Sequence, residues 1–206
     1  MDTKSQRKCV FCQAGELQID RTRLLEMLPT TNGTGSVPCR RGIFEDVYCV
    51  ATLAPEQYTR GHTLLILKNH RTDVTDTEIT EEELSGFTNA LTKLARHLKD
   101  RLGDHDSKRP ERIYVCCLCD GIEHLHAHLI PRYPFTDEDK TTYRQQFEER
   151  DGRQKIEEAL STCELGGFWY IAKREKDYTK ADFWSKPDED RARDLEQLAR
   201  KLKLGG

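Results

Sequence analysis

Apolar residues recur along this chain with two periods, one typical of helices and one typical of strands. Residues 80–102 carry an apolar side chain at every third or fourth position, as a helix with one buried face does, and Thr80 and Glu83 form a capping box at its start. Four segments have the apolar runs or alternation of strands: residues 43–53, 62–68, 112–119 and 124–131. Strands, a long helix and further strands predict an α+β fold with an antiparallel sheet.

The chain becomes strongly charged after residue 135, yet its pattern remains amphipathic. Residues 138–160 and 188–204 have helical periodicity, and residues 168–171 (FWYI) are a strand candidate. We therefore predict a catalytic domain over residues 1–135 and a C-terminal α/β extension over residues 136–206 that packs on it.

Composition and charge narrow the classes of function. The 206 residues include 33% charged residues and carry a formal net charge of −3, which argues against a general nucleic-acid binder. The sequence has no apolar run of transmembrane length and no visible secretory signal. We therefore expect a cytoplasmic protein that does not use a membrane, with reduced cysteines.

Two groups of residues indicate chemistry. Cys9 and Cys12 form a CxxC pair, which in a reducing compartment favours metal binding or redox work. His124, His126 and His128 recur with the period of a strand, so the three imidazoles are expected on one face. Every ring nitrogen on that face needs a partner, so three such rings are a costly way to build a core.

A face with three histidines supports either metal ligation or nucleophilic catalysis. Thiolates prefer zinc, so Cys9 and Cys12 suggest a structural zinc site that needs two further ligands. His70 and one of the three clustered histidines are the natural candidates. If His124 completes the site, His126 and His128 are free for chemistry.

The stretch His124-Leu-His-Ala-His-Leu-Ile resembles the His-φ-His-φ-His-φ-φ motif of the histidine-triad (HIT) superfamily, where φ is apolar. Residues 9–12 (CVFC), residues 61–70 (GHTLLILKNH) and residues 130–132 (IPR) extend the resemblance over residues 8–133. It is closest to the zinc-containing branch that joins nucleotide hydrolases to galactose-1-phosphate uridylyltransferase-like nucleotidyltransferases.

The resemblance implies a role for each histidine. His126 would attack the phosphorus of a nucleotide and carry the nucleoside monophosphoryl group, and His128 would bind the phosphate and assist proton transfer to the leaving group. Cys9, Cys12, His70 and His124 would hold a structural zinc ion. The implied protein is an enzyme acting on a nucleotide or nucleotide conjugate, and the implied assembly is a homodimer.

Substrate contacts are less regular than the triad. Thr52 stands near the place of the family's acidic ribose-binding residue, and Lys68 and Arg132 flank the histidine strands as candidates for phosphate contacts. Glu123 is a candidate to orient an imidazole, although a charged loop residue without a role fits that position equally well.

We predict hydrolysis of a nucleotide phosphoryl linkage through a nucleotidyl-histidine, because transferases of the uridylyltransferase type carry Gln where this chain has His128. Nucleotidyl transfer to a small acceptor is the alternative, and nucleic-acid end processing of the aprataxin type is less favoured. We also expect the extension to lend residues such as Trp169, Lys173 and Arg174 to the pocket.

Overall fold

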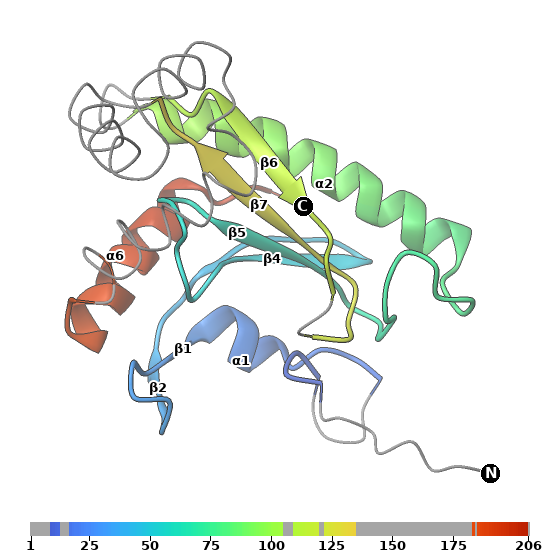
Figure 1. The fold of residues 1–206 in the computed structure, drawn as a ribbon, viewed down its shortest axis with the longest axis horizontal. Coiled ribbons are helices and arrows are strands. Elements are labelled where there is room, and N and C mark those ends of the chain that lie inside the picture. The colour runs from blue at the N-terminus through green and yellow to red at the C-terminus, as the bar shows by residue number, and fades with distance from the viewer. Residues whose placement is uncertain are drawn as a thin grey trace, which may run out of the picture.

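The computed structural model describes residues 9–12, 17–104, 109–119, 122–134, 183 and 185–205. Their centre is an antiparallel five-stranded sheet in the order β3-β4-β5-β7-β6 (Figure 1). The strands are β3 (Gly42–Glu45), β4 (Cys49–Leu53), β5 (Thr63–Leu67), β6 (Arg112–Cys116) and β7 (His126–Arg132). This sheet and its helices form the predicted α+β fold.

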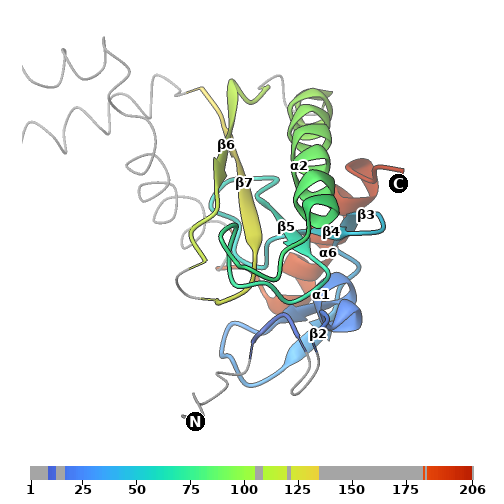
Figure 2. The same ribbon diagram turned by 90° about the vertical axis from the view of Figure 1, so that its right-hand side faces the viewer.

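The long helix α2 (Glu81–Arg101) covers one face of the sheet, as Figure 2 shows, and the short 3-10 helix η1 (Leu102–Asp104) continues it. Both hydrogen bonds of the predicted capping box are present between Thr80 and Glu83. Leu94 and Leu98 of the apolar stripe are fully buried, whereas Leu84 of the first turns is 38% exposed. The stripe therefore begins contacting the sheet one turn later than its periodicity suggests.

The opposite face of the sheet is covered by the N-terminal segment. Helix α1 (Arg21–Glu26) begins at Asp20, whose side chain accepts a hydrogen bond from the Arg23 amide, and leads into strand β1 (Met27–Pro29). Strand β1 pairs with β2 (Ser36–Pro38) in a separate hairpin. Leu24 of α1 packs in one cluster with Leu64 and Ile66 of β5. The sheet thus has apolar packing on both faces.

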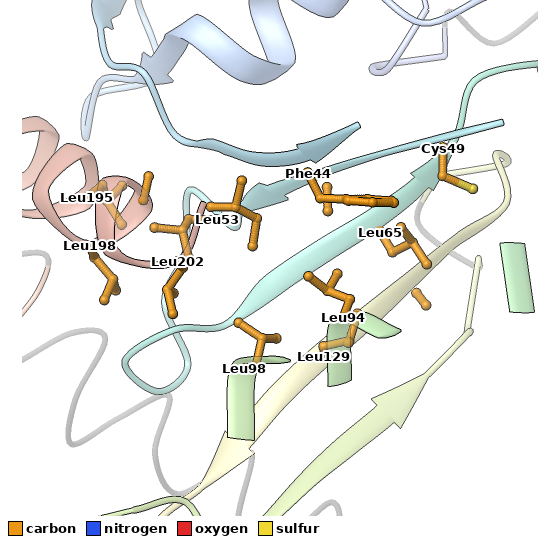
Figure 3. Close-up of a cluster of buried hydrophobic side chains, with 14 of the residues drawn as sticks. Phe44, Cys49, Leu53, Leu65, Leu94, Leu98, Leu129, Leu195, Leu198 and Leu202 are labelled. Carbon is orange, nitrogen blue, oxygen red and sulfur yellow. The ribbon is translucent and has the colours of Figure 1, made fainter. Parts of the chain in front are cut away.

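Helix α6 (Asp188–Lys201), from the region beyond residue 135, packs into the same core as α2. Figure 3 shows Leu195, Leu198 and Leu202 directed toward a cluster that also contains Leu98 and Leu129. The chain end closes over β3, because the Leu204 amide donates to the Ile43 carbonyl. The last helix is therefore part of the main hydrophobic core.

Two predicted boundaries differ from the structure. Residues 43–53 form two strands rather than one, because the Asp46 carboxylate accepts hydrogen bonds from the Tyr48 and Cys49 amides and turns the chain between β3 and β4. Strand β7 begins at His126, so His124 precedes the strand. The predicted helix at 138–160 and strand at 168–171 lie outside the described residues. No described helix is long and apolar enough to span a membrane.

Candidate active site and metal centre

The paired strands place two of the triad histidines on the face that carries α1. On β7, His126 lies opposite Ile66 and His128 lies opposite Leu64 of strand β5. Their neighbours Ala127 and Leu129 project to the other face and pack in the core with α2. The alternation of a strand therefore separates the chemical side chains from the apolar ones.

The His126 ring is held by its own backbone. Its Nδ1 lies 2.6 Å from the His124 carbonyl oxygen, an acceptor, so Nδ1 carries the proton and donates. The other nitrogen, Nε2, keeps its lone pair and has no hydrogen-bond partner among the described residues. The Phe11 ring contacts His126 edge-on, with the ring centroids 5.1 Å apart. His126 is 4% exposed, and its ring is fixed in one tautomer.

His128 is held through a second histidine. His62 Nδ1 donates to the Glu56 carbonyl oxygen at 2.8 Å, so His62 Nε2 can accept a hydrogen bond from His128 Nδ1 at 3.0 Å. Tyr58 stacks on His62 with centroids 4.8 Å apart, and His62 stacks on His128 at 5.2 Å. This chain of donors leaves His128 Nε2 unprotonated when both rings are neutral.

Burial keeps these imidazoles neutral. Desolvation, with the nearby His128, lowers the pKa of His62 to about 3. Desolvation and the nearby His126 lower the pKa of His128 to about 4, and desolvation also lowers the pKa of His126. A neutral imidazole with a free lone pair is the form that acts as a nucleophile or base.

The third triad histidine belongs to a different cluster. The ligand atoms of Cys9, Cys12, His70 and His124 all lie within 4.8 Å of one another. His124 Nδ1 is 3.5 Å from Cys9 Sγ, 3.4 Å from Cys12 Sγ and 3.2 Å from His70 Nδ1. The four predicted ligands therefore come together, although more than 100 residues separate the cysteines from His124.

The geometry of this cluster fits zinc. Bonds of about 2.3 Å to sulfur and 2.0–2.1 Å to nitrogen in a tetrahedron place two nitrogens about 3.3 Å apart and a sulfur and a nitrogen about 3.6 Å apart. The corresponding separations here are 3.2 Å, and 3.4 to 3.6 Å for the three contacts between sulfur and nitrogen. His124 Nε2 donates to the Leu67 carbonyl at 2.7 Å, which leaves Nδ1 free to ligate. Four protein ligands close the site, as in structural zinc centres.

A cavity of about 930 Å³ opens in front of His126 and His128. His62, Tyr58 and Phe11 line it beside the two histidines. The α1 segment and the β1–β2 hairpin contribute Asp20, Thr22, Arg23, Leu24, Met27, Pro29 and residues 33–36. The remaining lining residues are Val10, Arg41, Ala54, Pro55, Glu56, Leu64 and Ile122. Its size suits a ligand of nucleotide dimensions.

Two of the predicted phosphate-binding side chains have protein partners away from this cavity. Lys68 Nζ lies 2.9 Å from Glu45 Oε1, at the end of β5. Arg132 Nη1 lies 2.9 Å from Glu111 Oε2, at the end of β7. Neither residue is among the described residues that line the cavity.

The other two predicted substrate residues also lie off the cavity lining. Thr52 is fully buried, and its hydroxyl lies within hydrogen-bond distance of the Leu24 carbonyl and of Arg41 Nη1. Glu123 is exposed in the segment before His124. None of the four candidates lines the cavity with His126 and His128 in the described structure.

Sequence reasoning assigned no role to three residues that the structure places in the cavity: His62, Phe11 and Arg41. His62 occurs in the motif GHTLLILKNH, but the sequence does not show that it lies near the triad. The pairing of β5 with β7 brings the two together. Arg41 has no sequence signal, because an arginine in a polar stretch is ordinarily solvated.

The comparisons with known proteins agree with the triad. The family model described as HIT domain matches residues 38–135, a range that includes His62, His70 and the three clustered histidines. The protein named Protein hit, from Bacillus subtilis (strain 168), is 31% identical over 107 residues. That match covers 48% of this chain and 66% of the relative, just under two thirds of its length.

Solved structures of similar proteins carry related descriptions. A HIT-like protein involved in cell-cycle regulation from Bartonella henselae is 25% identical, with 47% of this chain and 71% of that chain covered and a TM-score of 0.39. A Zn-bound histidine triad family protein from Mycobacterium smegmatis is 18% identical, with 81% and 87% covered and a TM-score of 0.41. A histidine triad nucleotide-binding protein from Candida albicans is 22% identical, with 62% and 92% covered and a TM-score of 0.38.

Proposed function

We propose that this chain, which belongs to the histidine-triad superfamily, is a nucleotide phosphohydrolase that works through a nucleotidyl-histidine intermediate on His126. The observation that carries the proposal is the orientation of His126. Its Nδ1 proton is committed to the His124 carbonyl at 2.6 Å, and the ring lines the 930 Å³ cavity with an unshared Nε2. A buried neutral imidazole with one free nitrogen is a suitable nucleophile toward phosphorus.

The reaction then has two steps. His126 Nε2 forms a bond to the α-phosphorus while the bond from phosphorus to the leaving group breaks, and the leaving group takes a proton from His128 Nε2. Water next attacks the phosphorus of the nucleotidyl-histidine and gives one proton back to His128 Nε2, the P–N bond breaks, and the nucleoside monophosphate leaves. His126 returns to its starting tautomer, because the carbonyl of His124 holds the Nδ1 proton throughout.

His128 is the proposed partner for the phosphoryl group. Its ring lies 5.1 Å from that of His126, and its Nδ1 is engaged by His62, so Nε2 is the nitrogen left for substrate. Its pKa of about 4 in the free protein would rise beside an anionic phosphoryl group, because an opposite charge favours the protonated ring. Such a ring can bind a phosphoryl oxygen and deliver a proton to the leaving group.

The proposed zinc ion would be structural. Cys9, Cys12, His70 and His124 would hold it, and when bound it would tie the N-terminal segment to the end of β5 and the start of β7. That connection would keep Phe11 against the His126 ring, where the ring centroids are 5.1 Å apart. His124 thereby also presents the carbonyl that orients the nucleophile.

Replacing His126 tests the mechanism directly. His126→Asn removes the attacking nitrogen and keeps a polar side chain, so turnover of nucleoside phosphoramidates and dinucleoside polyphosphates should fall at least ~10³-fold. His128→Asn should cost less. His97→Asn is the matched control, because His97 lies on α2, bonded to the Leu202 carbonyl, and should retain wild-type turnover.

A covalent adduct is the second measurement. Quenching without acid during turnover, followed by mass spectrometry, should find a nucleoside monophosphate on His126 of the wild-type protein. Undiminished turnover by His126→Asn would contradict the proposal. If the adduct persists until a small-molecule acceptor is added, the reaction is nucleotidyl transfer instead of hydrolysis.

The remaining parts of the proposal concern surroundings and assembly. We place the protein in the cytoplasm, acting on a nucleotide or nucleotide conjugate as a homodimer, with residues 1–135 as the catalytic domain. Light scattering on the purified full chain should give twice the chain mass of 23.9 kDa.

A further inference from the structure

Arg41 is a buried cation in the wall of the active-site cavity. Arg41 is 3% exposed and lines the same cavity as His126 and His128. Nε donates to the Met27 carbonyl at 2.8 Å, and Nη1 donates to the Leu53 carbonyl and to Thr52 Oγ1. The side chain is thus held rigidly by three backbone or hydroxyl acceptors.

The guanidinium has no carboxylate partner in the described part of the chain. None of the ion pairs there involves Arg41, and no hydrogen bond uses its Nη2. Burial lowers its pKa to about 10, so the group remains charged at neutral pH. An uncompensated buried charge is costly, and a bound anion with a fixed position would offset that cost.

The strand register gives the distance from Arg41 to the histidines. Thr52 on β4 lies opposite Leu64 on β5, and Leu64 lies opposite His128 on β7. Residues opposite each other in antiparallel strands share a face, and two strand spacings amount to about 10 Å. Because Arg41 Nη1 is 3.2 Å from Thr52 Oγ1, the guanidinium lies on the histidine face about two strands from His128.

The space between these groups is enclosed by the N-terminal segment. Leu24 and Met27, from α1 and β1, line it beside Arg41. Residues 17–37 lie outside the range that the family model matches, whereas Arg41 lies within it. Arg23 adds a second cation at the exposed side of the same wall.

From this arrangement, and resting on the proposed function, we infer that the substrate is a nucleotide whose ribose carries a second phosphate on its 2′ or 3′ oxygen, read by Arg41. With its 5′ phosphorus at His126, a nucleotide would extend its sugar past Leu64, which lies opposite His128, toward Arg41. A substituent on the far edge of the ribose would then meet the guanidinium. A phosphate there supplies both the counter-charge and an acceptor for Nη2.

Paired ligands test this inference on the full chain. Calorimetry would compare each nucleoside 5′-monophosphate with its 3′,5′-bisphosphate and 2′,5′-bisphosphate, in the adenosine, guanosine and uridine series. For at least one base, one bisphosphate should bind at least ~10-fold more tightly than the monophosphate. The two bisphosphates distinguish the 2′ from the 3′ position.

Variants of Arg41 test the residue. Arg41→Met should bring the affinity ratio of bisphosphate to monophosphate toward one, and Arg41→Lys, which keeps a cation, should restore part of the ratio. Arg21→Gln is the matched control, because Arg21 is an exposed arginine of α1 that pairs with Glu45 and does not line the cavity. It should keep the wild-type ratio.

The outcomes separate this inference from the proposed function. Equal affinities within every pair, or no binding by any of them, would overturn the role of Arg41, even in a protein that forms the His126 adduct. An unchanged ratio in a folded Arg41→Met variant would do the same. A bisphosphate preference in a protein that forms no adduct would instead overturn the hydrolase mechanism.

Discussion

His62 has no chemistry of its own in the sequence pattern, yet it determines which nitrogen His128 presents to the cavity. It lies between Tyr58 and His128 in a stack of rings and accepts a hydrogen bond from His128 Nδ1. The Glu56 carbonyl fixes its tautomer from the other side. A side chain that is 1% exposed can hold this position only as a neutral ring.

The neutral rings predict a loss of stability in acid. The folded pKa values of His62 and His128 are about 3 and about 4, below the unfolded value near 6.5. The unfolded chain therefore binds more protons below pH 6.5. The stability that these rings contribute is complete above that pH and is lost as the pH falls toward 4 and then 3, by about 1.4 kcal/mol per pH unit for each ring.

Unfolding of His62→Gln by urea between pH 7 and pH 4 measures this term. The free energy of unfolding of the variant should fall less steeply with decreasing pH than that of the wild type, and the difference in slope should equal the contribution of one ring. This holds whatever the stability of the variant at pH 7. His97→Gln, which removes a half-buried histidine elsewhere, is the control and should keep the wild-type slope. Identical slopes for wild type and His62→Gln would mean that the folded protein protonates His62 as readily as the unfolded chain does.

Among the elements, the N-terminal segment depends most on contacts made far away in the chain. An isolated bridge between Cys12 and Ile19 joins residues 9–12 to residues 17–20. A second bridge, between Gln18 and Asn69, attaches this segment to the chain just after β5, where the Ile19 amide donates to the Lys68 carbonyl and the His70 amide donates to the Leu17 carbonyl. The other attachments of the segment are the four predicted zinc ligands and the packing of Phe11 and Ile19. Because this segment has so few backbone contacts with the rest of the chain, we expect a bound metal ion to stabilise its position.

Purified protein should therefore contain about one zinc ion per chain, and Cys9→Ser or His70→Ala should lose the metal together with thermal stability. Metal content by plasma mass spectrometry and the melting temperature measure the two effects. Cys117→Ser is the control, since Cys117 is exposed and outside the cluster. Loss of activity at an unchanged melting temperature would indicate a catalytic metal instead of a structural one.

For the whole molecule, the final helix α6 joins residues beyond 135 to the main hydrophobic core. Leu195 is 2% exposed and packs in the cluster that contains Leu94 and Leu129. The Arg40 amide donates to Glu196, and the Cys39 thiol donates to the Ala192 carbonyl, so α6 also supports the segment that leads into Arg41. Removing everything after Tyr133 would therefore expose the hydrophobic core. The same deletion would also remove any contact that the extension makes with substrate.

Leu195→Ala should lower the free energy of unfolding by about 2–5 kcal/mol, because it leaves a cavity among residues that cannot fully collapse. Arg193→Ala, on the exposed side of the same helix, should change it by less than about 0.5 kcal/mol. Urea unfolding of the full chain measures both. A Leu195→Ala variant as stable as Arg193→Ala would show that α6 is dispensable to the core.

The expected contribution of Trp169, Lys173 and Arg174 to the pocket stays a prediction, because these residues lie outside the described part of the chain. Substituting them one at a time in the full chain, instead of deleting the extension, separates a role in the pocket from the role of α6 in stability. A raised Michaelis constant at an unchanged melting temperature would support the pocket role.

The sequence by itself determined the features that depend on local periodicity and short-range chemistry. Alternating residues placed His126 and His128 on one face and Ala127 on the other, and the capping box located the start of α2. The CxxC pair, with His70 and one of the clustered histidines, suggested a metal site, and the resemblance to the HIT superfamily implied His124 as the fourth ligand; the structure brings these four ligand atoms within 4.8 Å of one another. Such patterns are readable because strand and helix periods fix the direction of each side chain.

Tertiary structure alone decided what surrounds His126 and His128. The pairing of β5 with β7 brought His62 to His128, and the folding of α1 over the sheet brought Arg41 to the cavity while Thr52 was buried beneath it. Lys68 and Arg132 met carboxylates at the sheet ends instead. The sequence could not decide these positions, because long-range register and packing determine which polar side chains face the cavity and which find partners elsewhere.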